Sequence, residues 1–347
     1  MIRVGVIGLG RVGMLHLMNS LKIKGASVVA AADASKSALA KARSLGVKRL
    51  FEDYRKLLNS SSDMDAVIIS LPNYLHFESV KLALEEGFNV FVEKPLALTL
   101  EESGEIVKLV RESGRKLMVG HCLRFLEVIR KMKESLDKGV IGRLEVATLE
   151  EVINGPFAHP RTPTPVSEWW FDPRKSGGGA LFDIGYHMID LFRFFAGDAD
   201  VVFASLDYKF NLPVEDGAIL ILRSKEGSVK GIINVGWYQQ TIFPRYNFRV
   251  ILHGNAGFLS SDHLVPHNLY LHAAKEGFKN LLRKVAGRRI RYLSYTYYYE
   301  PFYQELEHFF NCIKKDLDPM VSVEDGLKTV ELIRQAYTLA DNNSCKE

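Results

Sequence analysis

The feature that most constrains this 347-residue chain is the stretch that opens it, Arg3-Val4-Gly5-Val6-Ile7-Gly8-Leu9-Gly10-Arg11-Val12-Gly13. An apolar run as long as one buried strand leads into glycines spaced G-x-G-x-x-G, and residues 14–21 have helical periodicity. Gly8 permits the sharp turn, Gly10 lets the backbone approach a diphosphate, and Gly13 lets the helix lie close on its strand. The N–H groups at the helix start, beside Arg11 and Val12, then face the phosphates. The stretch predicts a dinucleotide site.

An acidic residue follows at the spacing that such a site needs. Residues 27–32 have the pattern of a second strand, which ends at Asp33, about 20 residues after the last glycine. A carboxylate there accepts hydrogen bonds from ribose hydroxyls and repels a 2′-phosphate, so NAD is favoured. Ser35 and Lys36 keep NADP open as a cofactor. The competing interpretation is a plain strand–turn–helix in which Asp33 caps a helix.

Length and composition indicate an ordinary two-domain protein. The chain is 47% hydrophobic and 25% charged, and its net charge of +4 is too small to imply nucleic acid as a partner. No apolar run is long enough to span a bilayer, and the chain begins with a strand instead of a leader, so we expect no transmembrane segment and a cytoplasmic location. Cys122, Cys312 and Cys345 are odd in number and lack C-x-x-C spacing, which predicts reduced thiols.

The order of expected elements predicts an α/β fold in two parts. Strands are expected at 27–32, 49–51, 65–71, 89–92, 116–120, 144–152, 201–210, 217–223, 228–238 and 247–254, and helices at 38–44, 54–58, 77–86, 100–113, from 180, at 301–314 and from 322. The early alternation of strand and helix predicts a doubly wound parallel sheet, a Rossmann domain over residues 1–122. The later alternating segments predict an α+β domain over residues 123–347, with an open, mostly antiparallel sheet. Its uncovered face is expected to pair subunits in a homodimer or homotetramer.

The run over residues 176–191 carries the chemistry of the second domain. If it is helical from Ala180, Asp183 and His187 lie one turn apart on one face, which suits general base catalysis. Asp190 could join them around a metal ion, but the sequence supplies no further ligand, so we expect no metal.

Together these motifs resemble those of the Gfo/Idh/MocA oxidoreductases over nearly the whole chain. The motifs are the glycine loop with His16 behind it, Pro72-Asn73 with His76, Glu93-Lys94-Pro95, Arg124-Phe125, Trp170 with Asp172-Pro173, and residues 176–191. Two positions depart from the family pattern: Leu71 stands where threonine is frequent, and Glu127 stands where proline is frequent.

The resemblance implies hydride transfer between a nicotinamide and a secondary alcohol or ketone carbon of a sugar, sugar derivative or cyclitol. It implies catalytic roles for three residues: His187 takes the hydroxyl proton, Lys94 binds the reacting oxygen, and Asp183 orients the substrate or the proton relay. It also implies a cis peptide bond before Pro95. The other residues expected at the cofactor are Leu71, Pro72, Asn73, His76 and Glu93, and those expected at the substrate are Arg124 and Trp170.

Some alternatives stay open. The loop over residues 154–170, rich in proline and aromatic residues, either stacks on a sugar ring or packs on the surface. Residues 275–291 predict an amphipathic helix with a basic face. Such a helix could be a solvated helix packed on the sheet or on a partner subunit. Alternatively, it could bind a phosphorylated or nucleotide-linked sugar, or contact an anionic membrane surface. Tyrosines at 292, 295 and 297–299 follow it. The alternative functions are a UDP-sugar 3-dehydrogenase and a non-catalytic dinucleotide-sensing regulator.

Overall fold

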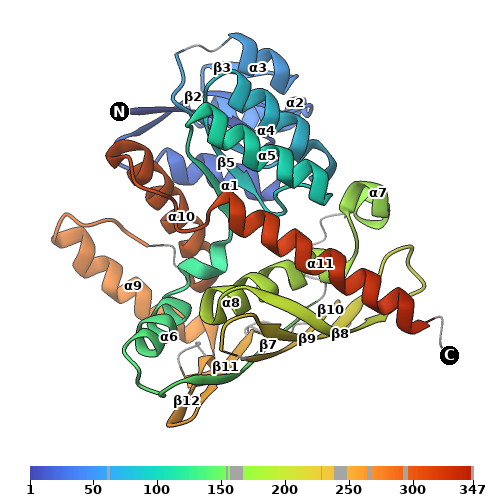
Figure 1. Ribbon diagram of the computed structural model, residues 1–347. Coiled ribbons are helices and arrows are strands. Elements are labelled where there is room, and N and C mark those ends of the chain that lie inside the picture. Colours follow the sequence, from blue (N-terminus) through green and yellow to red (C-terminus); the bar gives the residue numbers. More distant parts are fainter. Residues whose placement is uncertain are drawn as a thin grey trace. The chain divides into compact units, whose positions relative to one another are not determined.

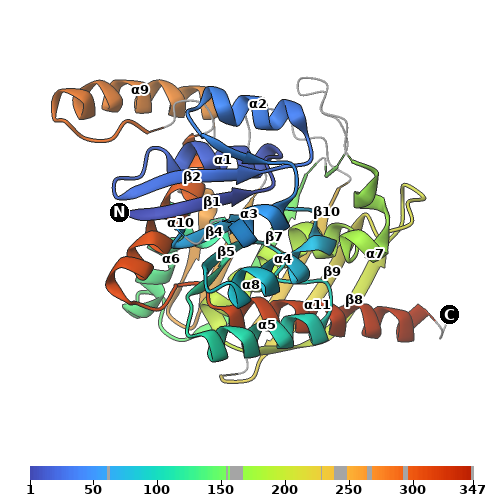
Figure 2. The ribbon, with the colours of Figure 1, turned by 90° about the horizontal axis from the view of Figure 1, so that it is seen from above.

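The computed structural model of the chain describes residues 1–60, 63–153, 155–156, 167–227, 229–237, 248–263, 268–291 and 296–344. The chain divides into two compact units (Figure 1, and from above in Figure 2). The first comprises Met1–His121, Arg174–Gly177 and Phe302–Glu331, and the second comprises Cys122–Pro173, Gly178–Pro301 and Leu332–Glu347. The expected single boundary at residue 122 stays a prediction, and the units differ from it because part of the closing helices packs with the N-terminal sheet.

The first unit is built on a six-stranded parallel sheet, here called sheet A. Its strands are β1 (Ile2–Ile7), β2 (Ala26–Ala32), β3 (Arg49–Phe51), β4 (Ala66–Ile69), β5 (Asn89–Glu93) and β6 (Leu117–Gly120), in the order β3-β2-β1-β4-β5-β6. The helices between them are α1 (Arg11–Ser20), α2 (Lys36–Ser44), α3 (Tyr54–Ser60), α4 (His76–Glu85) and α5 (Leu100–Ser113), the last three side by side (Figure 1). This strand order confirms the predicted Rossmann fold.

Close packing explains the first turn. Gly8 has φ +82°, and a Cβ on Gly13 would lie 1.8 Å from the Gly8 carbonyl oxygen, so only glycine lets α1 approach the strand. Every residue of β4 is buried, which requires helices on both faces of sheet A.

The later helices complete this core. Residues 302–315 of α10 (Thr296–Lys315) and the start of α11 (Val323–Ser344) belong to the first unit. The Phe309 ring of α10 lies 5.8 Å from that of Phe91 in β5, and Gly326 of α11 packs so tightly that a Cβ would lie 2.9 Å from Val119 of β6. The first unit thus contains two segments that are distant from sheet A in sequence.

The second unit contains a mixed sheet, here called sheet B, with strand order β12-β11-β7-β10-β9-β8. The strands are β7 (Leu144–Val152), β8 (Ala199–Asp207), β9 (Gly217–Ser224), β10 (Lys230–Gly236), β11 (Arg249–Gly254) and β12 (Gly257–Ser260). Only the β7–β10 pair in this order is parallel, so the predicted mostly antiparallel sheet is confirmed. Helix α8 (Tyr186–Ala196) covers one face (Figure 1), while Ile219, Ile221 and Ile232 remain exposed on strands β9 and β10.

Two helices of the second unit differ from the sequence-based prediction. Helix α6 (Glu127–Asp137) was not expected, and α9 spans Leu269–Val285 instead of residues 275–291. Gly287, at φ +63°, follows α9, so the basic residues at 288, 289 and 291 lie beyond the helix. The short elements of the second unit are the 3-10 helices at Cys122–Phe125, Glu168–Phe171 and Ser261–His263, whereas the 3-10 helix at Asn73–Leu75 and most of α7 (Pro173–Ser176) belong to the first unit. Within the described ranges, no helix combines the length and the apolar character needed to cross a membrane.

Candidate active site

The glycine loop and Asp33 form the cofactor side of the first unit. The Asp33 carboxylate accepts hydrogen bonds from the Leu9 N–H at 2.6 Å and from the Ser35 N–H at 2.7 Å, which holds it at the end of β2 beside the loop. Arg11 and Val12 begin α1, whose first turn carries no acidic side chain. A Cβ on Gly10 would meet nothing within 4 Å, so this side of the loop is open to an approaching ligand. An open glycine turn at a helix N-terminus beside a carboxylate fits an NAD molecule.

The loop after β4 is tied to its neighbours by side chains. The Asn73 amide donates to the Ser176 carbonyl oxygen at 2.7 Å. The ring nitrogens of His76 lie 2.6 Å from the Pro95 oxygen and 2.8 Å from the Leu71 oxygen, and burial lowers the pKa of this imidazole. His76 therefore holds together the two loops at the carboxyl ends of β4 and β5. Its expected role at the cofactor would be indirect, because it positions the backbone of these loops.

Lys94 follows β5 with its side chain partly exposed, and the Lys94–Pro95 peptide bond is cis, as the resemblance implied. The preceding residue, Glu93, lies 2.6 Å from the Nε2 atom of His16. The carboxyl group of Glu305 on α10 completes this group, and the three potential ligand atoms lie within 4.8 Å of one another. Burial, and then the neighbouring Glu93, raise the pKa of Glu305 well above its ordinary value.

In the second unit, the run over residues 176–191 begins with a π-helical turn, Leu181–Gly185, and continues as α8. The sequence predicted the start of this helix but not the wider turn. Glu215 caps the start of this run: its carboxylate accepts from the N–H groups of Gly179 at 2.8 Å and Leu181 at 3.0 Å, and its carbonyl oxygen accepts from the Ala180 N–H at 2.9 Å. Three donors that a helix start leaves unpaired are thereby satisfied by one residue before β9.

Glu215 is itself held by the last helix. The Tyr337 hydroxyl of α11 donates to the Glu215 carboxylate at 2.8 Å, and a Cβ on Gly178 would lie 1.8 Å from that hydroxyl. Burial raises the pKa of Glu215, while these hydrogen bonds oppose the rise. A Cβ on Gly179 would lie 1.8 Å from the Glu215 carbonyl oxygen, so Gly178 and Gly179 are both required by the close approach of these residues. Nothing in the sequence marks Glu215 except that it is an acidic residue just before a strand.

The π turn carries Asp183, and α8 carries His187 one turn later. The Asp183 carboxylate accepts a hydrogen bond at 3.3 Å from the indole N–H of Trp237, which is buried at the end of β10. Asp183 and His187 are both partly exposed, whereas the residues around them on the helix are buried. The unit therefore leaves a carboxylate and an imidazole, four residues apart, partly exposed among buried neighbours.

Arg124 and Trp170 were both expected at the substrate. The Arg124 guanidinium is buried and makes a bidentate ion pair with Asp190 of α8, at 2.8 and 2.6 Å, and it stacks 5.1 Å from the Phe194 ring. These contacts favour a role in anchoring α8 over direct contact with substrate. The Trp170 ring stacks on Trp169 at 4.7 Å. Most of the loop expected to stack on sugar, residues 154 and 157–166, lies outside the described residues, as do the tyrosines at 292 and 295 and the side chains at 297 and 298.

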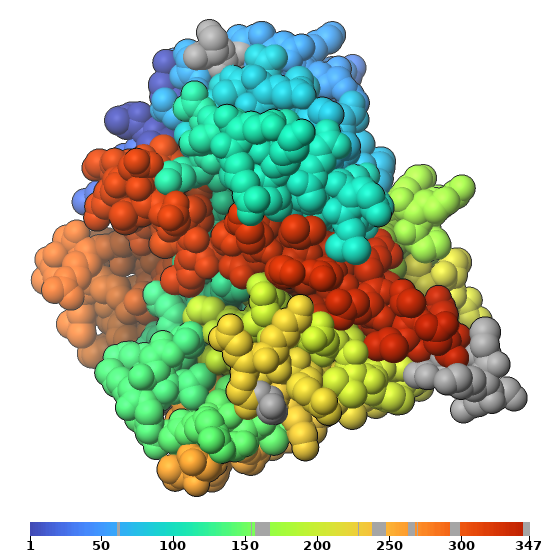
Figure 3. All heavy atoms as spheres, viewed as in Figure 1, coloured from blue at the N-terminus to red at the C-terminus, as the bar shows by residue number. Residues whose placement is uncertain are grey.

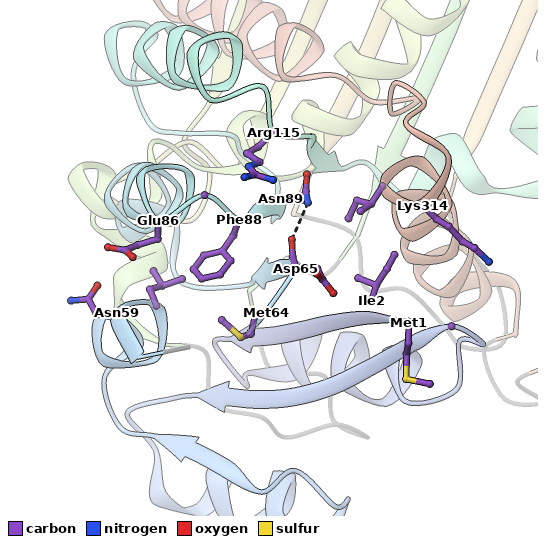
Figure 4. Close-up of a pocket in the computed structure, with 14 residues that line it drawn as sticks. Met1, Ile2, Asn59, Met64, Asp65, Glu86, Phe88, Asn89, Arg115 and Lys314 are labelled. Carbon is purple, nitrogen blue, oxygen red and sulfur yellow. Dashed lines mark hydrogen bonds between the residues drawn. The ribbon is translucent and has the colours of Figure 1, made fainter. Parts of the chain in front are cut away.

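A pocket of about 550 Å³ lies elsewhere in the first unit, at the amino ends of β1 and β5 (Figure 4). Its lining includes Ile2, Asp65, Asn89 and Arg115, and the Asn89 amide donates to the Asp65 carbonyl oxygen at 2.9 Å. Ligands of doubly wound sheets bind at the opposite, carboxyl ends of the strands. This pocket is therefore separate from the glycine loop and from Lys94.

Two family models match the chain. One, described as "Oxidoreductase family, NAD-binding Rossmann fold", matches residues 2–121, and the other, described as "GFO/IDH/MocA C-terminal domain", matches residues 129–260. The chain belongs to the Gfo/Idh/MocA oxidoreductase family. This confirms the resemblance and NAD as the cofactor, and it makes the protein an NAD-binding oxidoreductase.

Individual members of the family match along almost their whole length. The chain is 27% identical over 331 residues to the myo-inositol 2-dehydrogenase of Thermotoga maritima, covering 93% of this chain and 92% of that protein. It is 26% identical over 340 residues to the inositol 2-dehydrogenase of Rhizobium meliloti, covering 95% and 94%. The solved structure of scyllo-inositol dehydrogenase from Lactobacillus casei with bound NAD(H) and scyllo-inositol superposes with a TM-score of 0.80 at 22% identity, over 99% of this chain and 98% of that one. That likeness shows the fold.

Proposed function

We propose that this oxidoreductase is an NAD-dependent dehydrogenase that oxidises a secondary alcohol of a cyclitol or a related sugar, or reduces the corresponding ketone. The observation that carries the proposal is the π turn that fixes Asp183 one helical turn before His187, with Trp237 and Glu215 holding the turn. The inositol dehydrogenases among its relatives support the substrate class.

Each candidate residue has a distinct role in this proposal. His187 accepts the proton of the reacting hydroxyl, because an imidazole is a suitable base near neutral pH. Lys94 donates a hydrogen bond to the same oxygen and stabilises the charge that develops on it. Asp183 orients the substrate hydroxyls, and its own position is fixed by the Trp237 indole. Bound NAD supplies the acceptor for the hydride that leaves the carbinol carbon.

The cofactor choice and the assembly are further parts of the proposal. Asp33 favours NAD over NADP, since a 2′-phosphate would meet its carboxylate. The exposed isoleucines of sheet B support a homodimer or homotetramer that pairs through this face. The thiols of Cys122 and Cys312, which form no disulfide within the described residues, support a cytoplasmic location.

The test is NADH formation from NAD with a panel of inositols, other sugars and UDP-sugars. We expect turnover with a cyclitol or sugar, and we expect Lys94→Ala to abolish it while NADH still binds, as followed by its fluorescence. Lys108→Ala, which removes an exposed lysine of the same unit, is the matched control and should behave as wild type. Near-normal turnover of Lys94→Ala would refute the catalytic assignment, and turnover restricted to UDP-sugars would identify the alternative enzyme. Tight NADH binding without turnover on any of these compounds would favour the regulator.

A further inference from the structure

Helix α9 turns its apolar side away from the protein. Phe278, Leu281, Leu282 and Val285 are between 57% (Leu282) and 84% (Val285) exposed, and Tyr270 and Leu271 are also more than half exposed. Figure 1 shows α9 in orange at the edge of the second unit, and its atoms form part of the surface in Figure 3. A surface helix of a globular protein normally presents the opposite side, with polar residues in water.

The polar side of α9 is the side that packs on the chain. Glu276 and Asn280 are buried. The Asn280 side chain donates to the Arg291 carbonyl oxygen at 2.7 Å and accepts from the Arg291 N–H at 3.0 Å. Glu276 pairs with Lys279 at 3.0 Å and with Arg283 at 2.8 Å. These contacts hold the segment after α9 on the polar side of the helix, and the burial of Glu276 and Asn280 shows that this side faces the chain while the apolar side faces outward.

Lysines border this apolar face on both sides. With about 100° of rotation per residue, the residues from Tyr270 to Val285 that are apolar and exposed occupy an arc of about 120°. Lys275 follows one edge of the arc, and Lys284 precedes the other edge. Arg288, exposed just beyond the helix, adds a further positive charge. An apolar face between flanking cations is typical of a helix that lies in a membrane interface, where the aliphatic parts of lysines remain in the apolar region and the ammonium groups reach the headgroups.

We propose that α9 is a peripheral membrane anchor that lies in the surface of an anionic bilayer. Phe278, Leu281 and Leu282 enter the boundary between headgroups and acyl chains, and Lys275 and Lys284 contact lipid phosphates. The charges argue against a second copy of this helix as the occupant, because two identical faces would bring lysine borders of the same sign together. The inference does not depend on the proposed substrate. It is consistent with the described helices, none of which is long and apolar enough to cross a bilayer, because an interfacial helix lies in the surface of the membrane.

The experiment is sedimentation of the full chain with vesicles of phosphatidylcholine alone and vesicles that also contain phosphatidylglycerol. We expect binding to the anionic vesicles only, and a decrease as salt is added. Lys275→Gln and Lys284→Gln should each lower the partition coefficient about fivefold. The triple variant Phe278→Gln, Leu281→Gln and Leu282→Gln should abolish binding, with glutamine chosen because it preserves helix propensity.

The matched control removes exposed apolar side chains outside α9, as Val140→Gln and Leu317→Gln, and should bind as wild type. Thermal unfolding of every variant checks that both units are folded. Failure of the full chain to bind anionic vesicles, equal binding to neutral vesicles, or normal binding by the triple variant would overturn the proposal. A lower mass of the triple variant in lipid-free light scattering would identify a second copy as the occupant instead, and would also overturn it.

Discussion

The buried pair of Arg124 and Asp190 offers a direct test of whether this arginine anchors α8 or binds substrate. Arg124→Met leaves the Asp190 carboxylate, which is 1% exposed, without its main cation. Asp190→Leu leaves the guanidinium, which is 5% exposed, in the same position. Because both charges are desolvated in the folded protein, each single substitution should destabilise the second unit strongly, and the double variant should recover part of the loss.

The size of the effect follows from the geometry. The pair has two charge-assisted hydrogen bonds, at 2.8 and 2.6 Å, and the guanidinium also lies 5.1 Å from the Phe194 ring. Removing one member of such a pair costs about 3–5 kcal/mol, mostly because the other charge stays buried. For a unit of this size, that corresponds to a fall in Tm of roughly 6–20 °C.

The assay is thermal unfolding of the two single variants and the double variant, combined with KM for an accepted substrate. We expect a lower Tm for both single variants and, for the double variant, a loss of stability smaller than the sum of the two single losses. We also expect KM to change no more in Arg124→Met than in Asp190→Leu. An unchanged Tm with a KM raised only in Arg124→Met would refute the anchoring role and restore Arg124 to the substrate site.

Three further predictions concern the first unit and sheet B. Gly13→Ala should lower Tm, since its Cβ would lie 1.8 Å from a backbone oxygen. Gly10→Ala, whose Cβ would meet nothing within 4 Å, should leave Tm unchanged and weaken NADH binding in a fluorescence titration. Equal losses of Tm in the two variants would contradict this reasoning. The pKa of Glu305 is raised by burial and by Glu93, so the folded state keeps a proton that the unfolded state releases, and the free energy of unfolding should fall as pH rises above about 4.5. Glu305→Gln should remove this component in urea titrations across pH, and an unchanged pH dependence would show that the carboxyl is ionised. Ile221→Asp on the exposed face of sheet B should reduce the mass in light scattering; an unaltered mass would exclude that face as the subunit interface.

Elements that local patterns specify were predictable from the sequence. The bounds of β3, α5 and β7 agree with those expected. For α5 the reason is visible: Thr99 and Glu102 form a capping box at its start, and Gly114, at φ +63°, ends it. Elements defined by distant contacts were not predictable, as for the residues of α10 and α11 that pack with sheet A. Helix α9 begins earlier than expected because the Asn268 side chain caps its start, and it ends earlier because Gly287 follows it at φ +63°.

The candidate site shows the same division. The glycine loop, Asp33 and Lys94 were recognisable because each occupies a fixed place at the end of a parallel strand. Glu215 was not recognisable, since its partners at Gly179 and Leu181 lie 36 and 34 residues away in sequence. Arg124 matched a motif, but its motif could not reveal that Asp190 holds its guanidinium.

The contact between Tyr337 and Glu215 has a consequence for biosynthesis. The two residues are 122 positions apart, and Glu215 caps the residues that precede the π turn carrying Asp183. A nascent chain synthesised only as far as Glu331 would contain every segment of the first unit but would lack the Tyr337 hydroxyl that holds Glu215. Cofactor binding would precede turnover during synthesis, and proteolytic removal of the residues from Leu332 onward would abolish turnover while NAD affinity remained.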